Sequence, residues 1–157
     1  MRKAWRIVKP YRAEHAFSGE GARLCGGRWN SVGTPMIYTA ESKALAALEL
    51  LVHLDQQSVL DNYLCIPIRF SESILRALDM SGLPSEWRGH PPLRSIQRLG
   101  DEWMENEVSV VLEVPSVLIP GERNYLLNPR HPDFGEIEIG APEPFEFDPR
   151  VLKPARG

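Results

Sequence analysis

The sequence predicts an α+β fold, with a mixed β core and flanking helices. The expected elements run strand, strand, helix, strand, helix and then several strands, which is not the regular alternation of a βαβ fold. The 157 residues suit one domain with a real core, and no repeat or domain boundary is visible. Fourteen prolines indicate stiff loops around a compact sheet. We therefore expect a single domain over residues 1–157.

The first half of the chain offers three regular elements. Branched and aromatic residues predict strands at Trp5–Val8 and Met36–Thr39. Between them, 11–30 is rich in glycine, and we expect an extended loop with a tight turn. Ser42 is a good N-cap for a helix of Ala and Leu that reaches about Leu54.

The second half is expected to add one long helix and most of the sheet. Pro67 suggests an edge or a bulge in its strand, because proline cannot donate to a ladder. We expect strands at 60–70, 108–114, 124–127, 136–139 and 144–147, one or two helical turns at 73–78, a loop at 83–92 and a helix at 93–106.

The composition excludes several classes of protein. The formal net charge is -3, without a basic surplus or stripe, which argues against a nucleic-acid binder but still allows a local basic pocket for a phosphate-bearing small molecule. Cys25 and Cys65 form no CxxC, so neither a zinc site nor a disulfide framework is predicted, and we expect no metal. The N-terminus lacks the apolar core of a signal peptide, and no apolar run is long enough to span a membrane. We expect a cytoplasmic protein.

Glu49 is the most informative residue. It is the only acidic residue between Lys43 and Asp55, and at helical spacing it shares a stripe with Leu45 and Val52. A helix that is apolar on most sides is normally buried, and a buried carboxylate is costly without a partner. Either packing leaves Glu49 in water, or its carboxylate lines a cleft and has a function.

Other candidate residues gather before and after that helix. Arg28, in Gly26-Gly27-Arg28-Trp29-Asn30, follows two glycines and could fork onto a phosphate or carboxylate, although a surface ion pair is about equally expected. Tyr38 could stack on a flat ring or donate through its hydroxyl, but most strand tyrosines only pack.

Later in the chain, Ser116 follows a strand end. No GxSxG surrounds it, and alone it is better explained as a turn residue. Asn124 and Asn128 could each cap a turn or bind a ligand amide. No GxGxxG or GxxxxGK[ST] is present, so Rossmann and Walker-type nucleotide sites are unsupported. Together, an anion-binding arginine, an aromatic residue, a secluded carboxylate and small polar groups suit a phosphorylated substrate whose reaction develops positive charge.

These pieces resemble the RES-domain toxins of bacterial RES/Xre type II toxin–antitoxin systems, a family named for an Arg, a Glu and a Ser. The matching segments are Gly-Gly-Arg28-Trp-Asn, Tyr38-Thr-Ala, Ala-Leu-Glu49, Val-Pro-Ser116 and Asn124-Tyr-Leu-Leu-Asn128-Pro. Their order and spacing match from about Trp5 to just beyond Pro129, whereas the stretch from Pro142 is not aligned.

The resemblance implies a fold similar to ADP-ribosyltransferase toxins and an enzyme that degrades NAD at the nicotinamide–ribose bond, by hydrolysis or phosphorolysis, and so arrests growth. NAD would be the substrate, inorganic phosphate a second substrate in the phosphorolytic case, and no cofactor is implied. The implied partner is an Xre-type antitoxin that blocks the active site, with the toxin a homodimer in a larger complex. Membranes and direct nucleic-acid contacts are not implied.

Carried over by position, the resemblance assigns Glu49, Arg28 and Ser116 to catalysis. Arg28 would hold the pyrophosphate or ribose, Tyr38 the nicotinamide half, and Ser116 would lie beside Glu49. Asn124 is a substrate contact that Asn128 could replace, and Arg12 would add a second phosphate contact. Two alternatives stay open: an ADP-ribosyltransferase that modifies a protein, and a binding module without turnover.

Overall fold

The computed structural model describes residues 1–152 and confirms the predicted α+β class. The last five residues of the expected domain, 153–157, lie outside the described residues. A mixed sheet runs in the order β4-β5-β6-β2-β1-β3-β7, and β8 also pairs with β3. Only β4 and β5 are parallel among these pairs. The strands are β1 (Arg2–Val8), β2 (Ile37–Ala40), β3 (Tyr63–Phe70), β4 (Leu75–Ala77), β5 (Val111–Pro115), β6 (Arg123–Leu127), β7 (Glu138–Ile139) and β8 (Glu143–Phe145).

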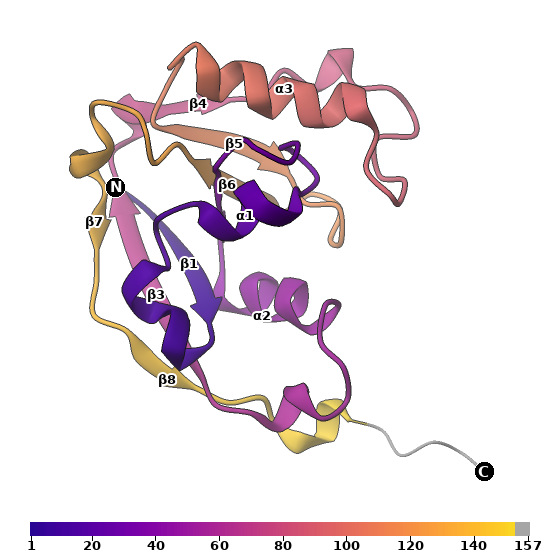
Figure 1. Ribbon diagram of the computed structural model, residues 1–157, viewed down its shortest axis with the longest axis vertical. Coiled ribbons are helices and arrows are strands. Elements are labelled where there is room, and N and C mark those ends of the chain that lie inside the picture. Colours follow the sequence, from indigo (N-terminus) through magenta and orange to yellow (C-terminus); the bar gives the residue numbers. More distant parts are fainter. Residues whose placement is uncertain (153–157) are drawn as a thin grey trace.

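The sheet divides where β1 meets β2. These two strands share a single paired position, Trp5 opposite Ala40. By contrast, every residue of β1 pairs with β3. The β4-β5-β6-β2 half and the β1-β3-β7 half therefore turn away from each other (Figure 1). The β2 edge next to β1 is left largely unpaired.

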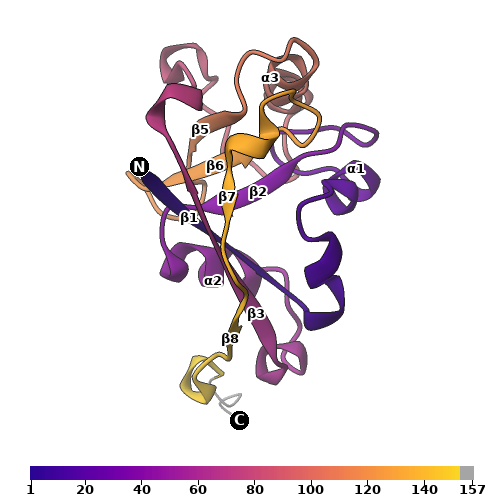
Figure 2. The same cartoon turned by 90° about the vertical axis from the view of Figure 1, so that its left-hand side faces the viewer.

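Three α-helices and several short 3-10 turns flank the sheet. The helices are α1 (Glu20–Cys25), α2 (Lys43–Leu51) and α3 (Arg94–Glu105), and the first 3-10 segment is η1 (Pro10–His15). Helix α3 lies over β4 and β5 (Figure 1). Segments η1 and α1 lie on one side of β1, and α2 lies on the other (Figure 2).

Separate apolar clusters fix these positions. Ile96 and Trp103 of α3 pack on Leu112 and Leu126 of β5 and β6. The opposite face of the same strands, with β1 and β3, holds a second cluster that contains Ile37, Phe70, Val111 and Leu127. Leu45 and Ala46 of α2 pack on Ile7 and Tyr63. Since burial of such apolar area is the main favourable term in folding, these clusters place α2 and α3 against the sheet.

Most predicted elements are confirmed, with shifts of a few residues at their ends. The backbone N–H of Leu45 donates to the Ser42 Oγ (3.0 Å), which confirms the N-cap, although α2 ends at Leu51 rather than near Leu54. Pro67 falls between the segments of β3 that pair with β8 and with β7, so it occupies a local interruption of that ladder.

Two predictions were wrong. The segment 11–30 is not simply an extended loop, because it contains η1 and α1. Gly19 (φ 77°) and Gly26 (φ 72°) stand at the two ends of α1, so glycines that suggested a loop instead begin and end a short helix. The segment 73–78 is not helical throughout, because it follows a 3-10 turn (Glu72–Ile74) with β4, which pairs in parallel with β5.

Candidate functional site

The sheet brings three of the predicted site positions to one end. Tyr38 pairs with Leu126 and Ala40 pairs with Asn124, so alternation places Tyr38 and Asn124 on one face. Pro115 pairs with Arg123, and Ser116 therefore leaves β5 at the end where β6 begins and where β2 passes into α2.

Glu49 lies on α2, at the boundary between the core and solvent. Leu45 is only 2% exposed and Val52 is 55% exposed, so the stripe they share with Glu49 runs out of the core, and the half-buried Glu49 lies between them. The helix is thus less buried than its composition suggested. Burial raises the pKa of the Glu49 carboxyl, while a hydrogen bond from the Asn124 side chain and the charge of Arg28 oppose that rise.

The two asparagines occupy opposite ends of β6. The Asn124 amide donates to the Thr39 carbonyl (3.1 Å), and the same side chain lies near enough to Glu49 to lower the pKa of its carboxyl. Asn128, which is fully buried, donates to the Met104 carbonyl (3.1 Å) and accepts the Arg130 N–H (2.9 Å). The Asn128 bonds connect β6 to α3 and to the chain that follows β6. Asn124, and not Asn128, is therefore the asparagine near Glu49.

Arg28 makes no ion pair within 4.0 Å in the described part of the chain, so the surface ion pair considered above does not form. Its half-buried guanidinium instead donates from Nη1 to the carbonyl oxygens of Trp87 (2.8 Å) and Gly89 (2.9 Å). Burial lowers the pKa of Arg28, and the nearby Tyr38 and Glu49 act in the opposite direction. The positive charge is therefore left without a close counter-ion.

Tyr38 supports the turn that carries Arg28. Its hydroxyl donates to the Asn30 Oδ1 (2.6 Å) and accepts the Trp29 N–H (3.0 Å). Burial is the main cause that raises the pKa of this hydroxyl, which keeps it neutral. A Cβ on Gly27 would lie 2.6 Å from the Tyr38 hydroxyl oxygen, so only glycine permits this approach.

Ser116 is fully buried and closes a turn. Its Oγ accepts the N–H groups of Leu118 (3.2 Å) and Ile119 (3.1 Å). It makes no hydrogen bond to Glu49 among the described residues. The turn interpretation is therefore what the geometry shows, and a role beside Glu49 stays a prediction.

Arg12 lies on η1 with its guanidinium exposed. It stacks over the Tyr11 ring (5.5 Å) and donates from Nε to the Tyr11 hydroxyl (3.3 Å). Its charge also acts on Arg6 of β1, because Arg12 is one of the causes that lower the pKa of Arg6. The two guanidinium groups therefore lie close enough to repel each other.

Arg6 is a site candidate that the sequence did not reveal. Its Nη1 donates to the Tyr38 carbonyl (3.0 Å) at the unpaired edge of β2, and its buried Nε has no hydrogen-bond partner in the described structure. Burial, and then Arg12, lower its pKa to about 10, so the group is still charged at neutral pH. Four residues earlier, Arg2 is paired with Glu72 (3.0 Å) and Glu113 (3.2 Å). A partly buried cation that has no counter-ion among residues 1–152 suits an anionic ligand.

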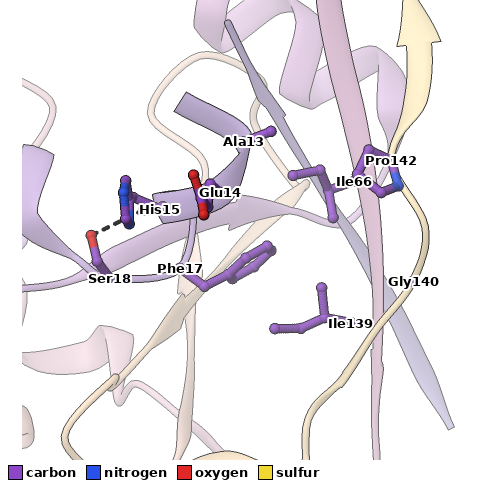
Figure 3. A pocket seen from close by; sticks show the side chains of 9 residues that line it. All are labelled: Ala13, Glu14, His15, Phe17, Ser18, Ile66, Ile139, Gly140 and Pro142. Atoms are coloured by element: carbon purple, nitrogen blue, oxygen red, sulfur yellow. Dashed lines mark hydrogen bonds between the residues drawn. The ribbon is translucent and has the colours of Figure 1, made fainter. Parts of the chain in front are cut away.

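A shallow pocket of about 450 Å³ lies elsewhere, between η1 and strands β3 and β7 (Figure 3). It contains none of the predicted site residues and is mostly apolar. Its lining is Ala13, Glu14, His15, Phe17, Ser18, Ile66, Ile139, Gly140 and Pro142.

Within residues 1–152, no cluster of three or more His, Cys, Asp or Glu side chains is arranged to hold a metal ion. No helix in the same range has the length and apolar character needed to cross a membrane.

Comparisons with known proteins show the family of the chain. The RES domain matches residues 3–148. The chain is 37% identical to "Toxin Res" of Photorhabdus laumondii, over 95% of this chain and 96% of that protein. It is 40% identical to "Toxin Res" of Yersinia enterocolitica, over 94% of this chain and 97% of that protein. It is 36% identical to the "Prs ADP-ribosylating toxin" of a Sphingobium strain, over 96% of this chain and 97% of that protein.

One solved structure shows the same fold. In the crystal structure of the M. tuberculosis MbcT-MbcA toxin-antitoxin complex, a chain 19% identical to this one superposes with a TM-score of 0.75, over 96% of this chain and 86% of its own. The chain therefore belongs to the RES-domain family, the family of these toxins.

Proposed function

We propose that this chain is a toxin that breaks the nicotinamide–ribose bond of NAD and so depletes the NAD of the cytoplasm. The observation that carries the proposal is the half-buried Glu49 carboxylate, whose pKa is raised by burial while the Asn124 side chain and the charge of Arg28 act in the opposite direction. Secluded carboxylates with perturbed pKa values concentrate at functional sites. A chain of the RES-domain family that holds Glu49, Arg28 and Tyr38 together has the groups that this reaction needs.

Glu49 would stabilise the transition state. As the bond to nicotinamide breaks, positive charge develops on the ribose, as in glycoside hydrolysis. The nicotinamide ring is positively charged while attached and leaves neutral, so the leaving group needs no proton. One carboxylate can therefore stabilise the developing charge and take a proton from the attacking group. The Asn124 side chain, which is held by its bond to the Thr39 carbonyl (3.1 Å), would help to orient that carboxylate.

The cations would bind the pyrophosphate. Within the described residues, Arg28 has no ion pair and the buried Arg6 Nε has no hydrogen-bond partner, and Arg12 lies close enough to lower the pKa of Arg6. Guanidinium groups match phosphate oxygens in geometry and charge. Tyr38 would orient the nicotinamide half, with Ser116 and Asn124 as small polar groups at the same end of the sheet.

Water and inorganic phosphate are both chemically competent acceptors of the ribosyl group, and no resident cofactor is part of this proposal. A protein acceptor is the second candidate. It is favoured by one observation, the name of the Sphingobium relative as an ADP-ribosylating toxin at 36% identity.

The partner in this proposal is an antitoxin that covers the site. The support is the fold shared with a chain from a toxin-antitoxin complex. We propose an Xre-type protein in that role, with the toxin as a homodimer inside the complex. Binding of the antitoxin would then suppress NAD turnover.

The test is to incubate purified protein with NAD labelled in its adenylate part, with and without phosphate, and to separate the products. Free nicotinamide with ADP-ribose indicates hydrolysis, the phosphorylated sugar indicates phosphorolysis, and label on protein indicates transfer. Glu49→Gln should abolish nicotinamide release, while Glu105→Gln, the same change at an exposed position on α3, should leave it intact. A folded and active Glu49→Gln protein would remove Glu49 from the mechanism, and no turnover by the wild type would leave only a binding module.

Arg28 is tested by affinity. Arg28→Ala should weaken NAD binding, measured by titration calorimetry in the Glu49→Gln background so that the substrate survives. The expected loss is about 1.5–3 kcal/mol, the usual contribution of a hydrogen bond to a charged group. Unchanged affinity would reject a binding role for Arg28.

A further inference from the structure

We propose that the segment 84–92, through Trp87, positions the Arg28 side chain for the anionic part of its ligand. This inference rests on the proposed function of the Arg28 site. The segment carries no group that the proposed reaction uses, yet it supplies both acceptors of the Arg28 Nη1, the carbonyls of Trp87 (2.8 Å) and Gly89 (2.9 Å).

These two bonds restrict the guanidinium without neutralising it. Nη1 carries two protons, and both are used by carbonyl oxygens, which have no net charge. Nη2 and Nε are therefore the donors left for a ligand. If a carboxylate held the guanidinium instead, its negative charge would offset the positive charge of Arg28 and weaken the attraction for an anionic ligand.

Trp87 fixes the position of these carbonyls. Its half-buried ring lies 6.0 Å from the ring of Trp29, which is only 3% exposed and belongs to the cluster under α3. Turn bonds from the Trp87 N–H to the Pro84 carbonyl (3.1 Å) and from the Gly89 N–H to the Glu86 carbonyl (2.8 Å) set the direction of the backbone.

The backbone next to Arg28 is held from the other side. Gln97 of α3 donates to the Gly27 carbonyl (2.9 Å). Helix α3 thus fixes where the Arg28 main chain lies, and the segment 84–92 fixes where its guanidinium points. Removing the Trp87 ring should free the side chain and leave the main chain in place.

The experiment compares Trp87→Ala with Trp87→Phe, which keeps an aromatic ring against Trp29. Without NAD, nitrogen-15 spectra should show separate Nη resonances for Arg28, assigned by their loss in Arg28→Lys, because the bonds from Nη1 slow its rotation. Trp87→Ala should merge them, and Trp87→Phe should keep them apart. Leu99→Ala is the packing control, since Leu99 belongs to the same apolar cluster as Trp87 but lies outside the segment that binds Arg28.

With NAD, Trp87→Ala should raise Kd and KM by about 10- to 100-fold, the effect expected for a group displaced by about 1 Å, while kcat changes less. Trp87→Phe and Leu99→Ala should stay near the wild type. In the Arg28→Ala background, Trp87→Ala should raise Kd no further, because residues that act through one contact are not additive.

Separate Nη resonances in Trp87→Ala, or an equal rise in Kd with and without Arg28, would overturn the inference. If the wild type neither binds nor cleaves NAD while the resonances still merge in Trp87→Ala, the proposed function fails and the positioning of Arg28 stands. The spectra therefore decide the positioning, and the NAD measurements decide the function.

Discussion

Gly100 lies in the middle of α3, where helix propensity and tertiary contact predict opposite effects for the change to alanine. Alanine is about 1 kcal/mol more favourable than glycine in a helix interior, so propensity alone predicts a more stable protein. A Cβ on Gly100, however, would lie 1.8 Å from the carbonyl oxygen of Trp29 and 2.8 Å from its carbonyl carbon. Helix α3 therefore rests directly on the backbone next to Arg28.

The steric cost should exceed the gain in propensity. A carbon and a carbonyl oxygen approach to about 3.3 Å at best, so α3 or the turn must move by roughly 1.5 Å. Overpacking usually costs about 1–3 kcal/mol, and the upper end applies here because a backbone carbonyl cannot change rotamer. After subtraction of about 1 kcal/mol for propensity, we expect a net loss of about 2 kcal/mol. In a chain of this size the melting temperature should fall by about 4–8 °C.

The assay is urea unfolding followed by tryptophan fluorescence, with Gly21→Ala as the matched control. Gly21 is also helical, in α1, but a Cβ there meets nothing within 4 Å, so this variant should gain up to about 1 kcal/mol. Gly100→Ala should also weaken NAD binding, because the displaced turn carries Arg28. A Gly100→Ala protein as stable as Gly21→Ala, or more stable, would refute the close packing of α3 on the turn.

Three further predictions concern Glu49, Asn124 and Tyr38. The Glu49 pKa is higher in the folded state than in the unfolded state. At pH values between these two pKa values the folded state binds more protons, so the free energy of unfolding falls as the pH rises through this range. Glu49→Gln has no charge to bury, so its free energy of unfolding in urea, relative to the wild type, should rise with pH and equal the wild-type value in acid. A difference between the two proteins that does not depend on pH would contradict the burial of the charge. Asn124→Ala removes a side chain that lowers the Glu49 pKa, so the acidic limb of kcat/KM should move to higher pH, and a shift to lower pH would contradict that effect of Asn124. Tyr38→Phe leaves the Trp29 N–H and the Asn30 Oδ1 without their partner, and should cost about 1–3 kcal/mol in thermal unfolding, whereas a neutral change would mean that water replaces the hydroxyl.

The elements that could be predicted are those specified by local patterns. Helix α2 has Ser42 as its cap followed by a run of strong helix formers, and α3 has apolar residues at helical spacing. Strand β4 could not be predicted in this way, because its three residues are extended only where β5 offers a parallel partner. Helix α1 was missed because two of the glycines that suggested a loop stand at its ends.

The residues of the candidate site also fall into those that a local sequence pattern indicates and those that only tertiary contacts reveal. Glu49 could be chosen from the sequence, because a carboxylate in an apolar helix is unusual locally, whereas the roles of Arg28 and Tyr38 followed from the family resemblance. The contacts that these residues make could not be predicted from the sequence. Asn124 and Asn128 were equivalent in the sequence, and only the register of β6 places one of them near Glu49.

The sequence by itself determined the fold class, the helix that carries Glu49 and the residue types of the candidate site, because propensity, capping and hydrophobic spacing act within a few residues. Only the tertiary structure decided which charges are buried and which are paired. Arg6 resembles an ordinary surface cation in the sequence, and only the fold brings its Nη1 to the Tyr38 carbonyl of β2 and buries its Nε. Trp87 lies in a loop with three prolines nearby until its carbonyl meets Arg28. Burial and pairing join segments far apart along the chain, so they follow from how the sheet divides and not from any local pattern.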